Sequence, residues 1–212
     1  MVYIFYTCCG RRLNNDTFNY YLKRLPFSFR IAILRYRHWE DAQRSLLGKA
    51  LLVDGLHYLG LKQYFLEDLK VSRLKKPYFD DSIDFNISHS GEFIVCAISL
   101  HGNAGVDIEE IKPLVIEEFE MYFSTNEWNQ IMQSPDSVTS FYKYWTQKEA
   151  FLKAIGMGLT VPIKDVEIFD NKIIWENNEW FIQEIKLDKK CIAHLCRNTP
   201  SDGLIIKKIN YN

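Results

Sequence analysis

The stretch GVDIE, Gly105 to Glu109, predicts a buried strand with one acidic face. Alternate side chains of an extended strand point to the same side, so Asp107 and Glu109 share a face while Val106 and Ile108 point into a core. Gly105 lies on the acidic face, where the missing side chain lets a ligand or another backbone approach closely. A pair of acids alone is more often solvated than bound to a metal, so the prediction of a site depends on a second element.

That second element is the stretch WTQKEAFLKAIGMGL, Trp145 to Leu159. Trp145, Glu149 and Lys153 are spaced four apart, so on a helix they form one stripe in which an acid and a base lie one turn apart. The same spacing also fits an ordinary core-packed helix with Glu149 and Lys153 as a surface ion pair. Magnesium favours a few carboxylates completed by water and substrate phosphates, and manganese could take the same oxygen ligands. The two stretches together predict a magnesium site for a phosphate-bearing ligand, with these carboxylate ligands: Asp107, Glu109 and Glu149.

Strands and helices alternate on both sides of these stretches. The spacing of apolar residues predicts helices over 36–59, 116–123, 125–132 and 137–155. Apolar runs predict strands over 2–6, 85–87 and 93–100, a turn over 88–92, and a meander of strands over 166–208. Gly60 and Gly156 are expected to end the two long helices. The order predicts an α+β fold of two similar halves, 1–103 and 104–212.

Composition narrows the class of protein. The chain of 212 residues is 47% hydrophobic and 15% aromatic, which is typical of an ordered globular protein, and its formal charge of −1 gives no overall field for nucleic acid or acidic membranes. Five cysteines, an odd number without paired ligand spacing, favour reduced thiols in the cytoplasm. The apolar start is too short for a signal peptide and comes before Arg11 and Arg12, whereas a signal peptide has its positive charges first. No stretch approaches the about 20 apolar residues that span a bilayer. We therefore expect a cytoplasmic protein whose partners include neither nucleic acid nor membrane.

Several other residues have an ordinary and a functional interpretation. The turn NISHSG, 86–91, could present backbone N–H groups and His89 to an anion, or could be a polar hairpin whose serines satisfy their own turn. Arg44 and Lys76 are ordinary surface cations unless the fold brings them near phosphates. Cys191, His194 and Cys196 could ligate a soft metal, but on an apolar strand such residues pack more often than they chelate.

Several motifs occur in one order along the chain: DAQRSLLG (Asp41 to Gly48), KP (Lys76, Pro77), FNISHSG (Phe85 to Gly91), GVDIE, FS-x-x-E (Phe123 to Glu127) and WTQKEAFLKAIGMGL. Together they resemble the 4′-phosphopantetheinyl transferases, in the monomeric two-half class of the surfactin-synthetase type. The resemblance covers most of 41–159. It implies two α+β halves related by a pseudo-twofold axis, with coenzyme A in the cleft between them.

The resemblance also implies a reaction. A serine hydroxyl of an apo acyl or peptidyl carrier protein would attack the β-phosphorus of coenzyme A, leaving 3′,5′-ADP and a carrier that bears the phosphopantetheine arm. Asp107 would act through the metal, Lys153 would offset charge on the leaving side, and Glu149 would take the serine proton, directly or through a metal-bound water, with Glu127 as a second candidate base. The residues implied to contact the phosphates of coenzyme A are Arg44, Lys76, Ser88, His89, Lys148 and Lys153.

The chain departs from the family pattern over 24–37, where related enzymes have lysines that hold the 3′-phosphate and this chain reads RLPFSFRIAILRYR. Arg30 is the candidate substitute. The segment 111–128 is expected to dock the carrier, with Met121 and Phe123 as apolar contacts. Two alternatives remain open: a magnesium-dependent phosphohydrolase that uses the same carboxylates, and a module that binds coenzyme A or a carrier without chemistry.

Overall fold

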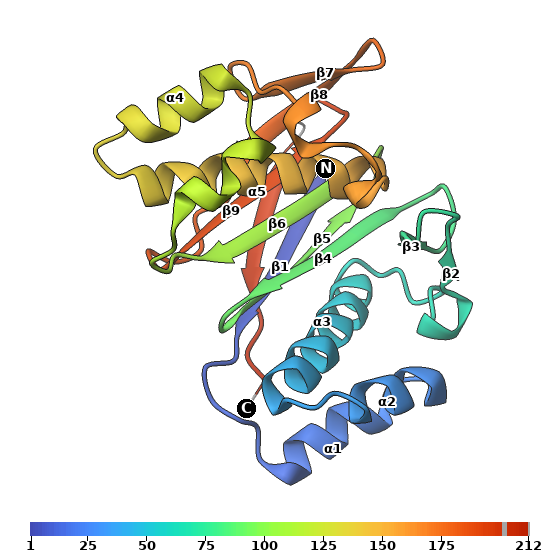
Figure 1. Ribbon diagram of the computed structural model, residues 1–212. Helices are drawn as coiled ribbons and strands as arrows, with labels where there is room; N and C mark the ends of the chain where they lie inside the picture. Colours follow the sequence, from blue (N-terminus) through green and yellow to red (C-terminus); the bar gives the residue numbers. More distant parts are fainter. Residues whose placement is uncertain (201–202, 212) are drawn as a thin grey trace.

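The computed structural model describes residues 1–200 and 203–211, which form two four-stranded sheets packed face to face, each with a long helix on its outer side (Figure 1). The first sheet has the order β10 (Leu204–Lys208), β1 (Val2–Cys8), β5 (Phe93–Ser99), β4 (Asp84–Ser90). The second has the order β6 (Ala104–Glu110), β9 (Cys191–Arg197), β8 (Asn178–Glu184), β7 (Lys172–Trp175). The α-helices are α1 (Asn15–Lys23), α2 (Phe27–Leu34), α3 (Trp39–Tyr58), α4 (Thr125–Gln133) and α5 (Ser137–Ile155).

Short elements connect these layers. A two-stranded hairpin and several 3₁₀ turns lie in the connections: β2 (Lys70–Val71), β3 (Pro77–Tyr78), η1 (Leu66–Asp68), η2 (Ile116–Tyr122), η3 (Gly158–Thr160) and η4 (Ile163–Asp165).

None of the helices in the described part of the chain is both long and apolar enough to cross a membrane.

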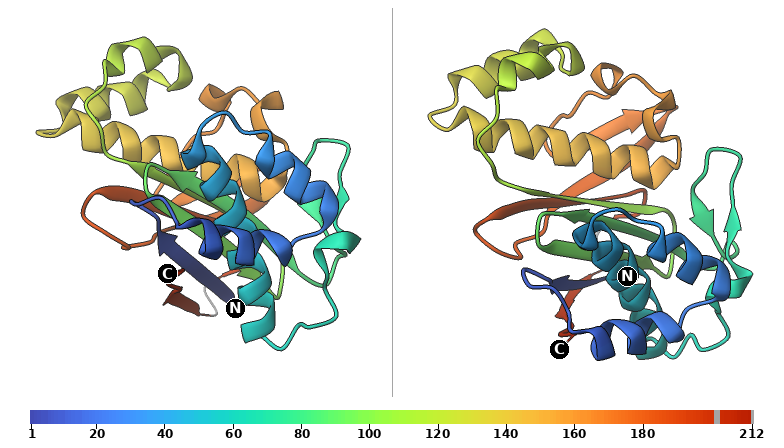
Figure 2. Two further views of the ribbon diagram at one scale, coloured as in Figure 1. Left: turned by 90° about the horizontal axis from the view of Figure 1, so that it is seen from below. Right: turned by 60° about the horizontal axis from the view of Figure 1, so that its bottom comes forward.

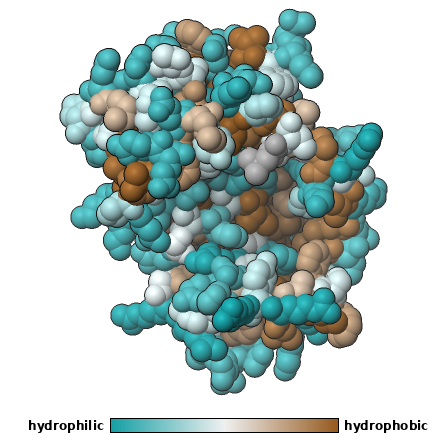
Figure 3. Space-filling view, viewed as in Figure 1, coloured by the Kyte–Doolittle hydropathy of each residue, from teal (hydrophilic) through white to brown (hydrophobic). Residues whose placement is uncertain are grey.

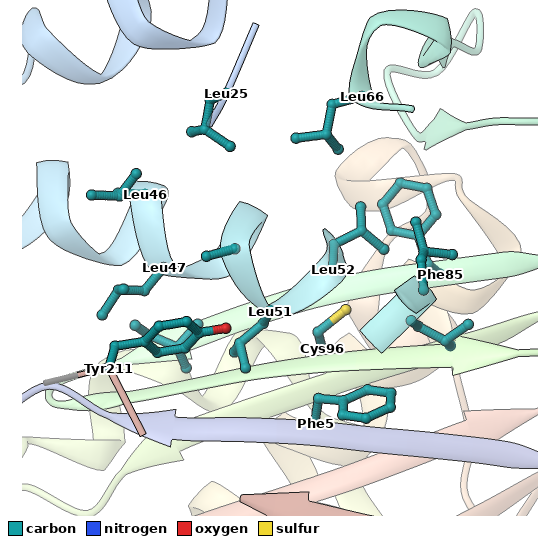
Figure 4. Close-up of a cluster of buried hydrophobic side chains, with 14 of the residues drawn as sticks. Phe5, Leu25, Leu46, Leu47, Leu51, Leu52, Leu66, Phe85, Cys96 and Tyr211 are labelled. Atoms are coloured by element: carbon teal, nitrogen blue, oxygen red, sulfur yellow. The ribbon is translucent and has the colours of Figure 1, made fainter. Parts of the chain in front are cut away.

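The β5 strand explains why the two sheets stack. All of its residues are buried, and alternation sends Ile94, Cys96 and Ile98 toward α3 while Phe93 and Val95 point to the second sheet. On the α3 side, leucines of the helix pack with Phe5 and Tyr211 in one cluster (Figure 4). On the other side, β5 and β1 meet the apolar residues of β6 and β9. The first sheet is therefore covered on both faces, as the nearly continuous apolar sequence of β5 predicts.

The outer helices follow from their sequences. In α3, buried residues recur every three or four positions, and α1 and α2 pack against its other side (Figure 2). In α5, Phe151 and Ala154 pack with Trp180 and Ile182 of β8 on the outer face of the second sheet. The helix begins at the cap Asp136, whose side chain accepts from the Thr139 amide, and ends in a left-handed Gly156, as predicted.

The predicted α+β fold is confirmed, with two differences. The predicted turn over 88–92 is wrong, because β4 continues to Ser90 in register with β5 and only Gly91 and Glu92 form the turn. The last predicted strand of the meander is also misplaced: β10 leaves the second sheet and pairs in parallel with β1. A division at 103/104 therefore separates β10 from the sheet that contains it. The part of the predicted meander at residues 201 and 202, and residue 212, lie outside the described part of the chain.

Candidate functional site

The site lies where β4 of the first sheet runs beside β6 of the second. Ser88 Oγ donates to Asp107 Oδ1 at 2.8 Å, and Ser90 Oγ donates to Glu109 Oε2 at 2.6 Å. In both pairs the carboxylate follows the serine by 19 residues, so β4 and β6 run side by side and in the same direction here. A serine–carboxylate pair thus recurs at every second residue along the line where β4 and β6 lie side by side, which we call the seam.

Helix α5 covers this seam because residue 105 has no side chain. A Cβ on Gly105 would overlap the Ala150 carbonyl oxygen and the Ala154 amide nitrogen, so only glycine allows the helix to lie this close to β6. At that distance Lys153 Nζ donates to Asp107 Oδ1 at 2.6 Å and to Ser88 Oγ at 2.8 Å. The predicted close approach at Gly105 is that of a helix backbone, and it brings the helical lysine to the strand carboxylate.

The other two predicted carboxylates lie near enough to Asp107 to disfavour each other's ionisation. Burial raises the pKa of Glu109, a hydrogen bond from Ser90 partly offsets it, and the charges of Asp107 and Glu149 raise it further. Burial also raises the pKa of Glu149, again reinforced by Asp107 and opposed by Lys153. Three acids and one lysine therefore form a single electrostatic cluster.

This cluster fits a hard divalent cation, although its side chains are not yet arranged around one. Asp107 is 3% exposed, and its Oδ2 is buried without a hydrogen-bond partner, which is costly unless a cation or donor occupies that side. Among residues 1–200 and 203–211, no three histidine, cysteine, aspartate or glutamate side chains are grouped so as to hold a metal. Asp107 Oδ1 accepts from Lys153 and Ser88, and Glu109 Oε2 accepts from Ser90, so one oxygen of each carboxylate is already engaged within the protein. The donor set is all oxygen, which suits magnesium.

Two more predicted residues meet at the end of β4. Arg44 of α3 donates from Nη1 to the Gly91 carbonyl at 2.9 Å and from Nη2 to Asp41 at 2.7 Å. His89 lies on β4 with its side chain open to solvent on one side; the protein around the rest of the ring desolvates it and, followed by the charge of Arg44, lowers the pKa of its imidazole. Lys153 also contributes to this shift, so cations of both α3 and α5 lie close enough to act on the histidine.

Lys76 reaches the other end of β4. Its Nζ donates to Asp84 Oδ2 at 2.7 Å and to the Ala154 carbonyl at 3.1 Å, which joins the connection after β2 to the last turn of α5. Beside it lies a cavity of about 470 Å³, lined also by Tyr78, Ile155 and Gly156. Figure 3 shows an apolar recess on this side of the molecule, right of centre. Lys76 is thus at a cavity, as a ligand contact must be, but already paired.

Lys148 does not join the cluster. It is fully buried, and its Nζ donates to Glu127 Oε2 at 2.6 Å and to the Ile163 carbonyl at 3.2 Å. Successive helical residues are rotated by about 100°, so the neighbour of Glu149 points away from the face that Glu149 and Lys153 share. The expected contact of Lys148 with coenzyme A therefore needs correction, and Glu127, which pairs with Lys148, is enclosed in the protein with 4% exposure.

Two further expectations change with the structure. Arg30 is engaged, because Nε and Nη2 donate to the Leu25 and Lys23 carbonyls at the end of α1. Phe123 is buried in a cluster with Phe141 and cannot serve as an outer contact, whereas Met121 is 71% exposed. The set Cys191, His194 and Cys196 packs within β9, as the ordinary interpretation holds.

Sequence reasoning missed Ser90 as a member of the site. Its bond to Glu109 repeats the bond of Ser88 to Asp107, two residues away on each strand. The alternation of Ser88 and Ser90 would have revealed it if 88–90 had been assigned to a strand instead of a turn.

Comparisons with known proteins point to one family. Residues 103–195 match the family model described as the 4′-phosphopantetheinyl transferase superfamily. The chain is 33% identical to 4′-phosphopantetheinyl transferase gsp of Aneurinibacillus migulanus over 193 residues, 84% of this chain and 77% of the relative. It is 34% identical to 4′-phosphopantetheinyl transferase ffp of Bacillus subtilis over 84% of both chains. With 4′-phosphopantetheinyl transferase Sfp of Bacillus subtilis (strain 168) it shares 36% identity over 63% of this chain and 61% of the relative.

Proposed function

The chain belongs to the 4′-phosphopantetheinyl transferase superfamily, and we propose that it transfers the phosphopantetheine arm of coenzyme A to a serine of an apo acyl or peptidyl carrier protein. The observation that supports this most strongly is the seam between β4 and β6. There Asp107 is held by Lys153 and Ser88, with one buried oxygen left without a partner. An acidic cluster bordered by cations suits a diphosphate with its divalent ion.

In this proposal each side chain has a task that its surroundings support. The diphosphate lies against Lys153 and Ser88, on the side of the acidic cluster that is nearer to Arg44. Lys153 offsets the negative charge that develops on the departing 3′,5′-ADP. Magnesium would be held by Asp107, Glu109 and Glu149, where it supplies charge neutralisation and polarisation of the diphosphate.

Glu149 is the proposed base. The serine oxygen attacks the β-phosphorus, the bond from that phosphorus to the bridging oxygen breaks, and the hydroxyl proton passes to the Glu149 carboxylate. What supports this is that Glu149 lies one helical turn from Lys153 and close enough to Asp107 for their charges to interact. Glu127 is a weaker candidate because it accepts from Lys148 and from the Ser124 amide within the protein interior.

The carrier is proposed to dock on 111–128. Within this segment the exposed apolar side chains are Val115, Met121 and Tyr122, all on or beside η2. Glu117 and Glu118 of the same turn are exposed, so the surface offers apolar contacts beside negative charge. A monomer in the cytoplasm remains our expectation for the whole protein.

The test is intact-protein mass spectrometry of apo carrier proteins after incubation with this protein, coenzyme A and magnesium, beside a chelator control. We expect a carrier to gain the mass of one phosphopantetheine, and the gain to disappear with chelator. Release of nucleotide without modified carrier would favour a phosphohydrolase. If carriers of several classes give neither modified carrier nor released nucleotide, the result would favour a binding module.

The Glu149→Gln variant separates binding from chemistry. Transfer should collapse while coenzyme A still binds, because the amide keeps the shape but can neither accept the proton nor neutralise the metal. The matched control is Glu179→Gln, an exposed acid paired with Lys172 on the hairpin of β7 and β8, far from the seam. Transfer by Glu149→Gln at the unchanged rate would contradict the assignment.

A further inference from the structure

A buried polar pair joins α5 to the second sheet on the face that carries the acidic cluster. His194 of β9 is the register partner of Asp107 on β6, so the two side chains leave the same face of the sheet as neighbours. His194 Nδ1 lies 2.7 Å from Thr146 Oγ1 of α5, and the two residues are 3% and 0% exposed. Thr146 precedes Glu149 by three residues, less than one helical turn. The pair therefore connects the neighbour of Asp107 on the sheet with the neighbour of Glu149 on the helix.

The contacts around this pair fix which group donates. The Thr146 hydroxyl also lies 2.7 Å from the Tyr142 carbonyl oxygen, and its single proton cannot serve both contacts. Both are hydrogen bonds only if Thr146 donates to Tyr142 and its Oγ1 accepts from His194 Nδ1–H. A neutral imidazole agrees with the burial that lowers the pKa of His194 to about 4, an effect that the charge of Lys143 reinforces. The Nε2 atom is then left to accept from the Gln147 amide at 3.4 Å.

Helix α5 is thus attached to the second sheet by two contacts of different kinds. At Gly105 the helix backbone lies against the strand, a packing contact that sets how close the helix comes. At His194 a directional, buried hydrogen bond to the helical threonine sets how the helix is turned about its own axis. Glu149 and Lys153 share one face of α5, so a rotation of the helix would move both of them relative to Asp107.

We propose that His194 is a positioning residue of the transfer site, which acts through Thr146 to hold α5 at the rotation in which Glu149 faces Asp107. This rests on the proposed function, in which both carboxylates bind the metal and Glu149 takes the serine proton. The bond from Lys153 to Asp107 cannot do this task during the reaction, because Lys153 then lies against the diphosphate. Thr146 and His194 are enclosed in the protein and touch neither ligand nor carrier, so their bond persists throughout.

The experiment removes this bond without changing the shape of the side chain. Thr146→Val replaces the hydroxyl by a methyl group, whereas Thr146→Ser keeps the hydroxyl. Binding of Mn²⁺, which takes the same oxygen ligands as magnesium, is measured by electron paramagnetic resonance, beside kcat and KM for coenzyme A. We expect Thr146→Val to bind Mn²⁺ about tenfold more weakly and to lower kcat about tenfold with little change in KM, in the range found when groups that orient metal ligands are removed. Thr146→Ser should restore Mn²⁺ affinity and kcat.

The matched control is Thr139→Val in the first turn of the same helix. It also loses a hydroxyl that makes a hydrogen bond, there to the cap Asp136, but it has no contact with His194. This variant should lose stability and keep both Mn²⁺ affinity and kcat. A purely structural role of Thr146 would give the same result in Thr146→Val.

Each outcome decides between the two claims. If Thr146→Val lowers the unfolding temperature but keeps full Mn²⁺ affinity and kcat, the inference is overturned while the proposed function stands. If the wild type binds Mn²⁺ and modifies no carrier, the proposed function fails, and the Mn²⁺ affinities still decide whether the pair positions the carboxylates. A wild type that binds no Mn²⁺ contradicts both. Should Thr146→Val not fold, His194→Asn, whose amide nitrogen can donate in place of Nδ1, is compared with His194→Leu: affinity kept in the first and lost in the second supports the inference, and equal affinities overturn it.

Discussion

At the scale of single residues, the three carboxylates of the seam oppose one another in the absence of a cation. Burial and mutual repulsion raise the pKa of both Glu109 and Glu149. An acid whose pKa is higher in the folded protein binds protons more tightly there than when unfolded. Its contribution to stability is therefore present at low pH and is lost as the pH rises from the ordinary glutamate value through the raised one.

This predicts a linked effect of pH and magnesium. We expect magnesium to raise the unfolding temperature of the wild type at neutral pH and to have little effect well below the raised pKa values, because protonated carboxylates do not bind it. Thermal unfolding with magnesium or chelator across pH measures this. In Asp107→Asn the magnesium effect should vanish, whereas the exposed control Glu67→Gln should keep it; equal magnesium effects in all three proteins would refute the metal assignment.

Residue spacing predicted much of this site, whereas the expected role of Lys148 came from the resemblance alone. The alternation in GVDIE and the four-residue stripe of the helix correctly associated Asp107 with Lys153, because both patterns are fixed by backbone geometry. The resemblance implied that Lys148 contacts the ligand, but the helical rotation from Glu149 turns its side chain into the core. Its true partner, Glu127, is 21 residues away, and local spacing carries no information on such a contact.

At the scale of elements, the position of α5 depends on Gly105. Alanine there would force the helix away from β6, since its Cβ would meet helix backbone and not a flexible side chain. We expect Gly105→Ala to lower the free energy of unfolding by about 1–3 kcal/mol, the usual cost of overpacking, and to reduce transfer further by drawing Lys153 from Asp107. Denaturant unfolding and the carrier assay test both parts.

The matched control is Gly48→Ala, at the equivalent contact of α3 with the first sheet. There the nearest atom is a side-chain methyl at 3.1 Å, which can yield, and alanine also favours the helix. The loss of stability should be smaller than at Gly105. A Gly105→Ala protein as stable and active as the wild type would show that α5 can shift without consequence.

The buried pair of Lys148 and Glu127 ties three elements together. Lys148 belongs to α5, Glu127 forms the capping box of α4 with Ser124, and the Ile163 carbonyl lies in η4. Lys148→Met leaves a buried carboxylate without its cation and should cost about 3–5 kcal/mol. The double variant Lys148→Met, Glu127→Leu should recover most of this loss in denaturant unfolding, since no charge then stays buried; a double variant no more stable than the single one would argue against this account.

At the scale of the whole molecule, the two halves are alike in layers but not separate in sequence. Each sheet has a long helix outside and shares its inner face with the other. The sequence could predict the layers from apolar periodicity. It could not predict that β10 joins the first sheet, because a short apolar strand carries no signal for which of two edges it will pair with.

A fragment of residues 1–103 should therefore not fold as a half. It would expose the β1 edge that β10 covers and would leave an opening in the α3 cluster that Tyr211 fills. We expect this fragment to aggregate alone and to become soluble when expressed together with 104–212. Gel filtration of the separate and joint products measures it, and a monomeric, folded 1–103 fragment would be the contrary result.

The pairing of β1 with β10 also has a consequence in time. The ribosome makes β1 long before β10, yet the edge of β1 is closed by Leu204–Lys208 and by the bond from the Ile209 amide to the Tyr6 carbonyl. The first sheet therefore stays unfinished until β10 has left the exit tunnel. Nascent chains of this protein should thus carry an open strand edge from the emergence of β1 to that of β10, which is where a chaperone that shields such edges would act.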